Sequence, residues 1–130
     1  MPIAYWCVLV CVLAPYFLLV ASRSEASRKQ YVRDPRTYSE GLSGWRKRAH
    51  LAHLNAFEAT PAILAGVVIA ELAAAPRLHI DVLAVMFVVF RALHAGLYIA
   101  DIPMLRSHAW RFGILCVIGL FIDAAVYGQR

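Results

Sequence analysis

The sequence has few charged residues for a chain of 130 residues. Asp, Glu, Lys and Arg make up 16% of it, whereas a soluble domain usually carries about 25%. Hydrophobic residues account for 62%, and the mean hydropathy is +0.64. This composition favours a membrane protein over a soluble one, and it leaves no room for a separate soluble domain. We therefore expect a single membrane domain over residues 1–130.

Cysteine is also scarce, and its placement excludes two common kinds of small protein. The three cysteines, Cys7, Cys11 and Cys116, all lie within apolar runs. Their odd number and their spacing give neither a disulfide framework nor a zinc pattern, so we expect them to be buried as small hydrophobic residues. His50 and His53 are close in sequence, but no HExxH motif and no third ligand accompany them, and no metal site is predicted.

The net charge of +5 comes from an uneven distribution of basic residues. Eight of the 13 Lys and Arg residues lie between Arg23 and Arg48. A basic loop beside apolar runs is typical of a membrane protein, where it sets the orientation and meets anionic lipid headgroups. The charge therefore indicates membrane lipid as a partner, and no nucleic acid.

Four apolar stretches are long enough to cross a bilayer, which takes about 20 residues. They predict helices over residues 3–22, 44–75, 80–102 and 108–127, with Pro76 and Pro103 marking the ends of the second and third. A cleaved signal peptide is the alternative for the first stretch. No Lys or Arg precedes it, however, so we expect a spanning helix there. The predicted fold class is all-α, an integral membrane four-helix bundle.

The basic residues also predict an orientation. The first and third loops together carry ten Lys and Arg residues, namely the eight above with Arg106 and Arg111. The other side keeps Arg77 and Arg130. Since basic loops stay in the cytoplasm, we expect the first and third loops to be cytoplasmic and both termini to be outside.

Polar residues lie inside the second and third predicted helices, where an ionisable side chain costs roughly 2.5–3.5 kcal/mol on insertion scales. On the second helix, Asn55 and Glu58 share a face, and Arg48 falls near the same face. The third helix carries a stripe of polar residues with the spacing 3, 4, 3: Arg91, His94, Tyr98 and Asp101. Such residues face protein or a water-filled cavity. The simplest arrangement pairs Glu58 with Arg91 or His94, and a purely structural ion pair is the alternative to a functional site.

Small residues recur every four positions on the same two helices. This spacing lets membrane helices approach closely, and it predicts two packing ridges: Ala62, Gly66 and Ala70, and Ala92, Gly96 and Ala100.

The polar residues resemble those of the MAPEG family, the membrane-associated proteins in eicosanoid and glutathione metabolism. The segment from Arg48 to Glu58, followed by Pro61, is similar to the family's second helix. The segment from Arg91 to Tyr98, followed by Leu105-Arg106-Ser107, is similar to its third helix and the next turn. The resemblance covers nearly the whole chain.

This resemblance implies a homotrimer that binds glutathione between protomers and acts on lipophilic substrates as a transferase or peroxidase. It also implies roles for single residues. Asn55 and Glu58 would hold the backbone of glutathione, and Glu58 would meet its amino group. Arg106 would approach the sulfur as the catalytic residue, with Ser107 beside it. Four further residues would belong to the glutathione site: His94, Tyr98, Arg91 and Arg48, with Arg23 as a looser match.

The sequence departs from the family pattern at three positions. Glutathione-using members carry an arginine four residues or one residue before the asparagine, where this chain has Leu51 and Leu54. Trp110 stands where some members have a tyrosine. Two alternatives to the enzyme therefore stay open: a non-catalytic membrane protein that binds a lipid or another anionic small molecule, and a structural assembly protein whose buried charges fix the helix register.

Overall fold

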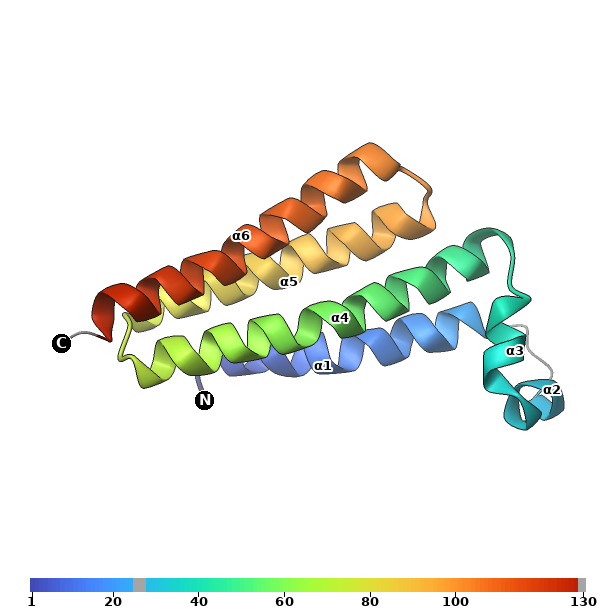
Figure 1. The fold of residues 1–130 in the computed structure, drawn as a ribbon, viewed down its shortest axis with the longest axis horizontal. Coiled ribbons are helices and arrows are strands. Elements are labelled where there is room, and N and C mark those ends of the chain that lie inside the picture. Colours follow the sequence, from blue (N-terminus) through green and yellow to red (C-terminus); the bar gives the residue numbers. More distant parts are fainter. Residues whose placement is uncertain (25–27, 129–130) are drawn as a thin grey trace.

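A computed structural model describes residues 1–24 and 28–128, and it contains four long helices that lie side by side (Figure 1). These are α1 (Ile3–Ser22), α4 (Gly44–Leu72), α5 (Arg77–Ile99) and α6 (Pro103–Tyr127). Each is long and apolar enough to cross a membrane. The predicted membrane four-helix fold is thus confirmed.

Both ends of the bundle have a distinct composition. The α4–α5 turn, the start of α1 and the end of α6 lie at one end in Figure 1, and the α5–α6 turn lies at the other end, with α2 and α3. The described part of the basic segment between Arg23 and Arg48 therefore lies at the same end as the turn before Arg106 and Arg111, as the sequence predicts. Arg130, one of the two basic residues expected on the opposite side, falls outside the described residues.

The loop between α1 and α4 contains two short helices, α2 (Arg28–Arg33) and α3 (Pro35–Glu40), that the sequence did not predict. Asp34 caps α3 by accepting hydrogen bonds from the Thr37 amide (3.2 Å) and the Thr37 hydroxyl (2.8 Å). These bonds hold the pKa of the Asp34 carboxyl below its usual range. Pro35 occupies the first turn, where its missing amide hydrogen costs nothing. The Asp-Pro pair therefore starts a helix here.

Two of the predicted helix ends are wrong, and the turns explain why. Helix α4 ends at Leu72, because Ala74 takes the left-handed conformation (φ 54°) and the Ala75 amide bonds back to the Ala70 carbonyl (3.0 Å). Helix α5 ends at Ile99 in the same way, with Asp101 at φ 61°. Glycine usually marks this geometry in a sequence, and neither turn has one.

The starts of α5 and α6 also differ from the prediction. Helix α5 begins at Arg77, directly after Pro76, and α6 begins at Pro103 instead of residue 108. A proline cannot continue the helix before it, but its fixed φ suits the first position of the next helix. Pro103 is the first residue of α6, so the α5–α6 turn is only three residues long, from Ala100 to Ile102.

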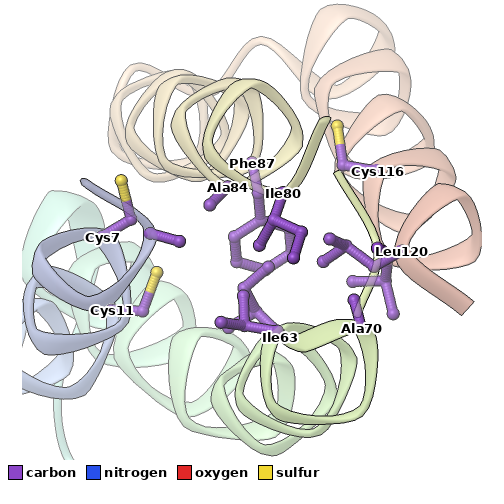
Figure 2. Packing of buried hydrophobic residues seen from close by; sticks show 13 residues of the cluster. Cys7, Cys11, Ile63, Ala70, Ile80, Ala84, Phe87, Cys116 and Leu120 are labelled. Carbon is purple, nitrogen blue, oxygen red and sulfur yellow. The ribbon is translucent and has the colours of Figure 1, made fainter. Parts of the chain in front are cut away.

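Apolar side chains from all four long helices form the core. Phe87, Ile63, Ile80 and Leu120 are its largest fully buried members, and they meet between α4, α5 and α6 (Figure 2). All three cysteines are buried and free, as the sequence predicts.

The two small-residue ridges have different surroundings. On α4, Gly66 and Ala70 are buried, and a Cβ atom added at Gly66 would lie 3.1 Å from Cδ1 of the fully buried Leu120 on α6. On α5, a Cβ atom at Gly96 would meet nothing within 4 Å, and Ala92 and Ala100 are also exposed. The first ridge therefore packs inside the protomer, whereas the second lies on its surface.

Polar groups tie the helices together where the backbone lacks partners. Pro15 has no amide hydrogen, which frees the Cys11 carbonyl on α1, and the Thr60 hydroxyl of α4 donates to that carbonyl (3.0 Å). Nδ1 of the buried His53 donates to the Pro15 carbonyl (2.8 Å). At the other end, Asp81 of α5 accepts from the amide of Ala4 (2.8 Å) and caps α1. These bonds fix α1 against its neighbours.

The Gly66 contact generates a stability prediction. Gly66→Ala should lower the unfolding free energy by about 1 kcal/mol, because Leu120 has no space to move into. Gly96→Ala is the matched control, and it should leave stability unchanged or raise it by up to about 1 kcal/mol through helix propensity. Thermal unfolding of detergent-solubilised protein measures both. A stabilising Gly66→Ala would contradict the packing described for α4 and α6.

Candidate functional site

A polar cavity of about 390 Å³ opens between α4, α5 and α6, toward the basic end of the bundle. Asn55 comes from α4, and His94 and Tyr98 come from adjacent turns of α5. The first two turns of α6 contribute the remaining lining residues: Arg106, Ser107, Trp110 and Arg111. Five residues singled out in the sequence, namely Asn55, His94, Tyr98, Arg106 and Ser107, thus line one space, which we call the polar cavity.

Aromatic contacts position the charged side chain of this cavity. The guanidinium carbon of Arg106 lies 4.2 Å from the centre of the Tyr98 ring, which is a cation–π contact. The Tyr98 ring in turn meets the His94 ring edge to face at 5.6 Å. The contact holds the Arg106 cation over the cavity while leaving its hydrogen-bond donors available in the plane of the guanidinium.

His94 lines the cavity with a buried imidazole. The residue is only 3% exposed, and its inaccessible Nδ1 atom has no hydrogen-bond partner among the described residues. A buried polar nitrogen without a partner costs about 1–3 kcal/mol. One wall of the cavity therefore contains a polar group that the protomer leaves unsatisfied.

Ser107 is fixed by its own helix. Its hydroxyl donates to the Pro103 carbonyl one turn earlier (3.0 Å), which leaves the oxygen as an acceptor.

The half-buried Arg91 pairs with an amide instead of a carboxylate. Its guanidinium donates to Oδ1 of Asn55 at 2.7 Å, joining α5 to α4. The expected pairing of Glu58 with Arg91 or His94 is wrong, because no ion pair links these residues within 4.0 Å and Glu58 is exposed. Asn55 is three residues before Glu58 on α4, at the level of Arg91, and the neutral amide avoids the cost of burying a carboxylate.

The other site residues predicted from sequence lie outside the polar cavity. Arg48 donates to the carbonyl of Ile99 (2.9 Å), where it caps the C-terminal end of α5, a favourable place for a cation. Asp101 falls beyond the end of α5, so the polar stripe on that helix has three members instead of four. Glu58 lies on α4, one turn deeper in the bundle than Asn55.

Arg23 lines a different hollow, the outer groove. This groove of about 500 Å³ lies between the ends of α1 and α4 and the α3 helix, and Leu51 and Leu54 also line it. Arg23 donates to the Tyr31 hydroxyl and stacks on that ring at 4.0 Å. Arg23 and the two leucines that replace the family's arginines thus share a surface that is separate from the polar cavity.

A larger hollow, of about 740 Å³, lies in the loop around α3 and contains none of the predicted site residues. Its lining includes Arg33, Thr37 and Arg46. It is open to solvent beside two short helices, whereas the polar cavity is framed by three long helices and contains a buried unpaired histidine. We therefore assign the candidate site to the polar cavity.

Two lining residues were not recognised from the sequence as site residues. In the sequence, Arg111 is recognisable only as a basic residue that sets the membrane orientation, and Trp110 only as a departure from the family pattern. Trp110 is one helical turn after Arg106, so the spacing of 4 on a single helix would have placed both on one face. Within the described residues, no group of three His, Cys, Asp or Glu side chains can hold a metal ion.

Comparison with known proteins identifies the family. The MAPEG family model matches residues 3–126, which include every residue that lines the polar cavity. No curated protein and no solved structure matches the chain. The family match, the four long apolar helices and the shared cavity agree with one another. The chain therefore belongs to the MAPEG family of four-helix membrane proteins.

Proposed function

We propose that the protein binds glutathione in the polar cavity and acts as a transferase or peroxidase on lipophilic substrates. The observation that carries the proposal is the convergence of Asn55, His94, Tyr98, Arg106 and Ser107 on one cavity. These residues come from three helices, and they are among those that the family resemblance connects with glutathione.

The charge of the cavity suits this ligand. Glutathione carries two carboxylates and one ammonium group at neutral pH, so its net charge is negative. Arg106 and Arg111 supply two guanidinium groups, and Asn55, Tyr98 and Ser107 add neutral polar groups to the lining. The volume of about 390 Å³ falls within the range of small-molecule sites. The donor set therefore fits an anionic tripeptide.

Bound glutathione would supply a thiol, which must ionise before its sulfur attacks an electrophile. Arg106 would stabilise the resulting thiolate, because a neighbouring guanidinium lowers the pKa of a thiol. The exposed indole of Trp110 lies at the rim of the cavity. This rim would admit a lipophilic second substrate from the bilayer.

The assembly belongs to the same proposal. Glu58 and Arg23 lie outside the polar cavity of one protomer, although the resemblance assigns both to the glutathione site. A homotrimer would complete the site by bringing a second protomer to it. The exposed ridge of Ala92, Gly96 and Ala100 offers a surface on which helices can approach closely. We place the basic end of the bundle in the cytoplasm and both termini outside.

A non-catalytic binding protein is the second candidate, and Leu51 and Leu54 favour it. They leave the outer groove with apolar side chains where glutathione-using relatives have arginine, so fewer charged groups are available for the tripeptide. In that case the polar cavity would hold a lipid headgroup or another small anion. Native mass spectrometry separates the two, because a copurified lipid or anion that glutathione fails to displace would favour the second candidate.

Glutathione binding is measured by calorimetry on detergent-solubilised protein. We expect heat that saturates in the millimolar range or below, and at least a tenfold loss of affinity in Arg106→Leu, on the order of one charge-assisted hydrogen bond. Arg77→Leu is the matched control, since Arg77 is an exposed arginine at the other end of the bundle. Absence of heat from the unmodified protein at millimolar glutathione would exclude this function.

The assembly is tested by native mass spectrometry of protein released from lipid nanodiscs. We expect a trimer, which Gly96→Leu should weaken because the leucine side chain separates the two helix surfaces. Ala125→Leu, at an exposed alanine of α6, is the control for added bulk. A monomer or dimer in the unmodified protein would contradict the proposed assembly.

A further inference from the structure

The contact between Arg91 and Asn55 fixes which end of the Asn55 amide faces which neighbour. The guanidinium of Arg91 donates to Oδ1 of Asn55 at 2.7 Å. An arginine side chain has five N–H donors and no acceptor, and it keeps its charge in proteins. Only the oxygen of an amide can bind such a group, so Arg91 excludes the flipped orientation in which Nδ2 of Asn55 would face it. The oxygen of the amide is therefore committed to α5.

The nitrogen of the same amide is left as a donor. Asn55 lines the polar cavity and is half-buried. No described residue accepts a hydrogen bond from its Nδ2 atom, and that atom is not among the enclosed polar atoms of the described residues. The two N–H groups of Nδ2 are therefore accessible, on a residue whose oxygen is already occupied.

Most of the other lining residues supply donors as well. The guanidinium groups of Arg106 and Arg111 only donate, and so does the indole of Trp110. Ser107 keeps an acceptor, because its hydroxyl hydrogen is given to the Pro103 carbonyl. Among the described residues that line the cavity there is no Asp or Glu. The lining thus suits the oxygen atoms of an anion and offers no carboxylate to an ammonium group.

We propose that Arg91 is a positioning residue, which makes Asn55 a hydrogen-bond donor to a ligand carboxylate in the polar cavity. Arg91 is absent from the lining of that cavity, so it acts through Asn55. The inference rests on the proposed function, in which the polar cavity binds an anion. It adds that the cavity recognises a carboxylate portion of the ligand, whereas an ammonium group is bound by residues outside the cavity.

Exchanging the amide for a carboxylate tests the direction of this hydrogen bond. Asn55→Asp keeps an acceptor for Arg91 but has no donor for the ligand. Its affinity for glutathione, measured by calorimetry, should fall at least about tenfold, on the order of one hydrogen bond to a charged group. Unchanged or tighter binding would mean that Asn55 accepts from the ligand, and it would overturn the proposal.

The matched control makes the same exchange elsewhere. Gln30→Glu adds a carboxylate at an exposed residue of α2, outside the polar cavity. Its affinity for glutathione should change by less than about threefold at physiological salt, because screening weakens the effect of an exposed charge. A loss as large as that of Asn55→Asp would show that added charge alone weakens binding, which would contradict the donor role of Asn55.

Two replacements of Arg91 separate positioning from packing. Arg91→Lys retains a group that only donates, so it should keep most of the affinity for glutathione. Arg91→Gln can donate or accept, which allows the Asn55 amide to turn, and its affinity should fall about fivefold or more. Thermal unfolding shows whether both variants are folded. Equal affinities in the two folded variants would contradict the positioning role.

Asn55 is the only asparagine of the chain, so its side chain can be observed by itself. Protein labelled with isotopic asparagine gives one pair of side-chain amide signals by NMR in detergent. Glutathione and glutarate, a dicarboxylate without an ammonium group, should both shift this pair downfield at millimolar concentration, as a hydrogen bond to an anion does. A response to glutarate but not to glutathione would sink the glutathione function and support this inference. If neither ligand shifts the pair, or if calorimetry detects glutathione while the pair stays in place, the inference is wrong.

Discussion

The hydrogen bond from Arg91 to Asn55 is the interaction on which the arrangement of this bundle depends. A guanidinium inside a membrane-spanning helix must find an acceptor, and the 2.7 Å bond to Asn55 Oδ1 provides one from α4. The bond sets the level of α5 relative to α4. It also separates two cavities, since Asn55 lines the polar cavity and Arg91 lines a second, mainly apolar cavity between α1, α4 and α5. One polar contact therefore marks the boundary between the two cavities.

The same requirement explains how the remaining helices are held. In a bilayer each backbone group needs a partner within the protein. The Cys11 carbonyl that Pro15 leaves free is bound by Thr60, and the amide of Ala4 is bound by Asp81. Arg48 does the same for the Ile99 carbonyl at the end of α5. Arg48, which the sequence suggests as a site residue, thus completes the backbone of a neighbouring helix, as Thr60 and Asp81 do.

A sequence does not distinguish a polar residue that lines a cavity from one that binds the backbone of a neighbouring helix, and this limits what can be predicted from it. The four spans could be predicted because an apolar run of about 20 residues has few alternatives. The spacing of His94 and Tyr98 placed them on one face of α5, and the structure brings both to the polar cavity. Hydrogen-bond partners on different helices, such as Asn55 for Arg91 or Ile99 for Arg48, depend on the register between helices, which periodicity does not encode. The left-handed turn at Ala74 could not be predicted either, because no glycine marks it in the sequence.

An anionic, glutathione-like ligand that binds among α4, α5 and α6 would be visible in a structure determined with glutathione present in the membrane mimetic. We expect ligand density in the polar cavity, in contact with Arg106 and Asn55 and beside His94. Density confined to the outer groove beside Leu51 and Leu54, or an empty polar cavity at saturating glutathione, would contradict it.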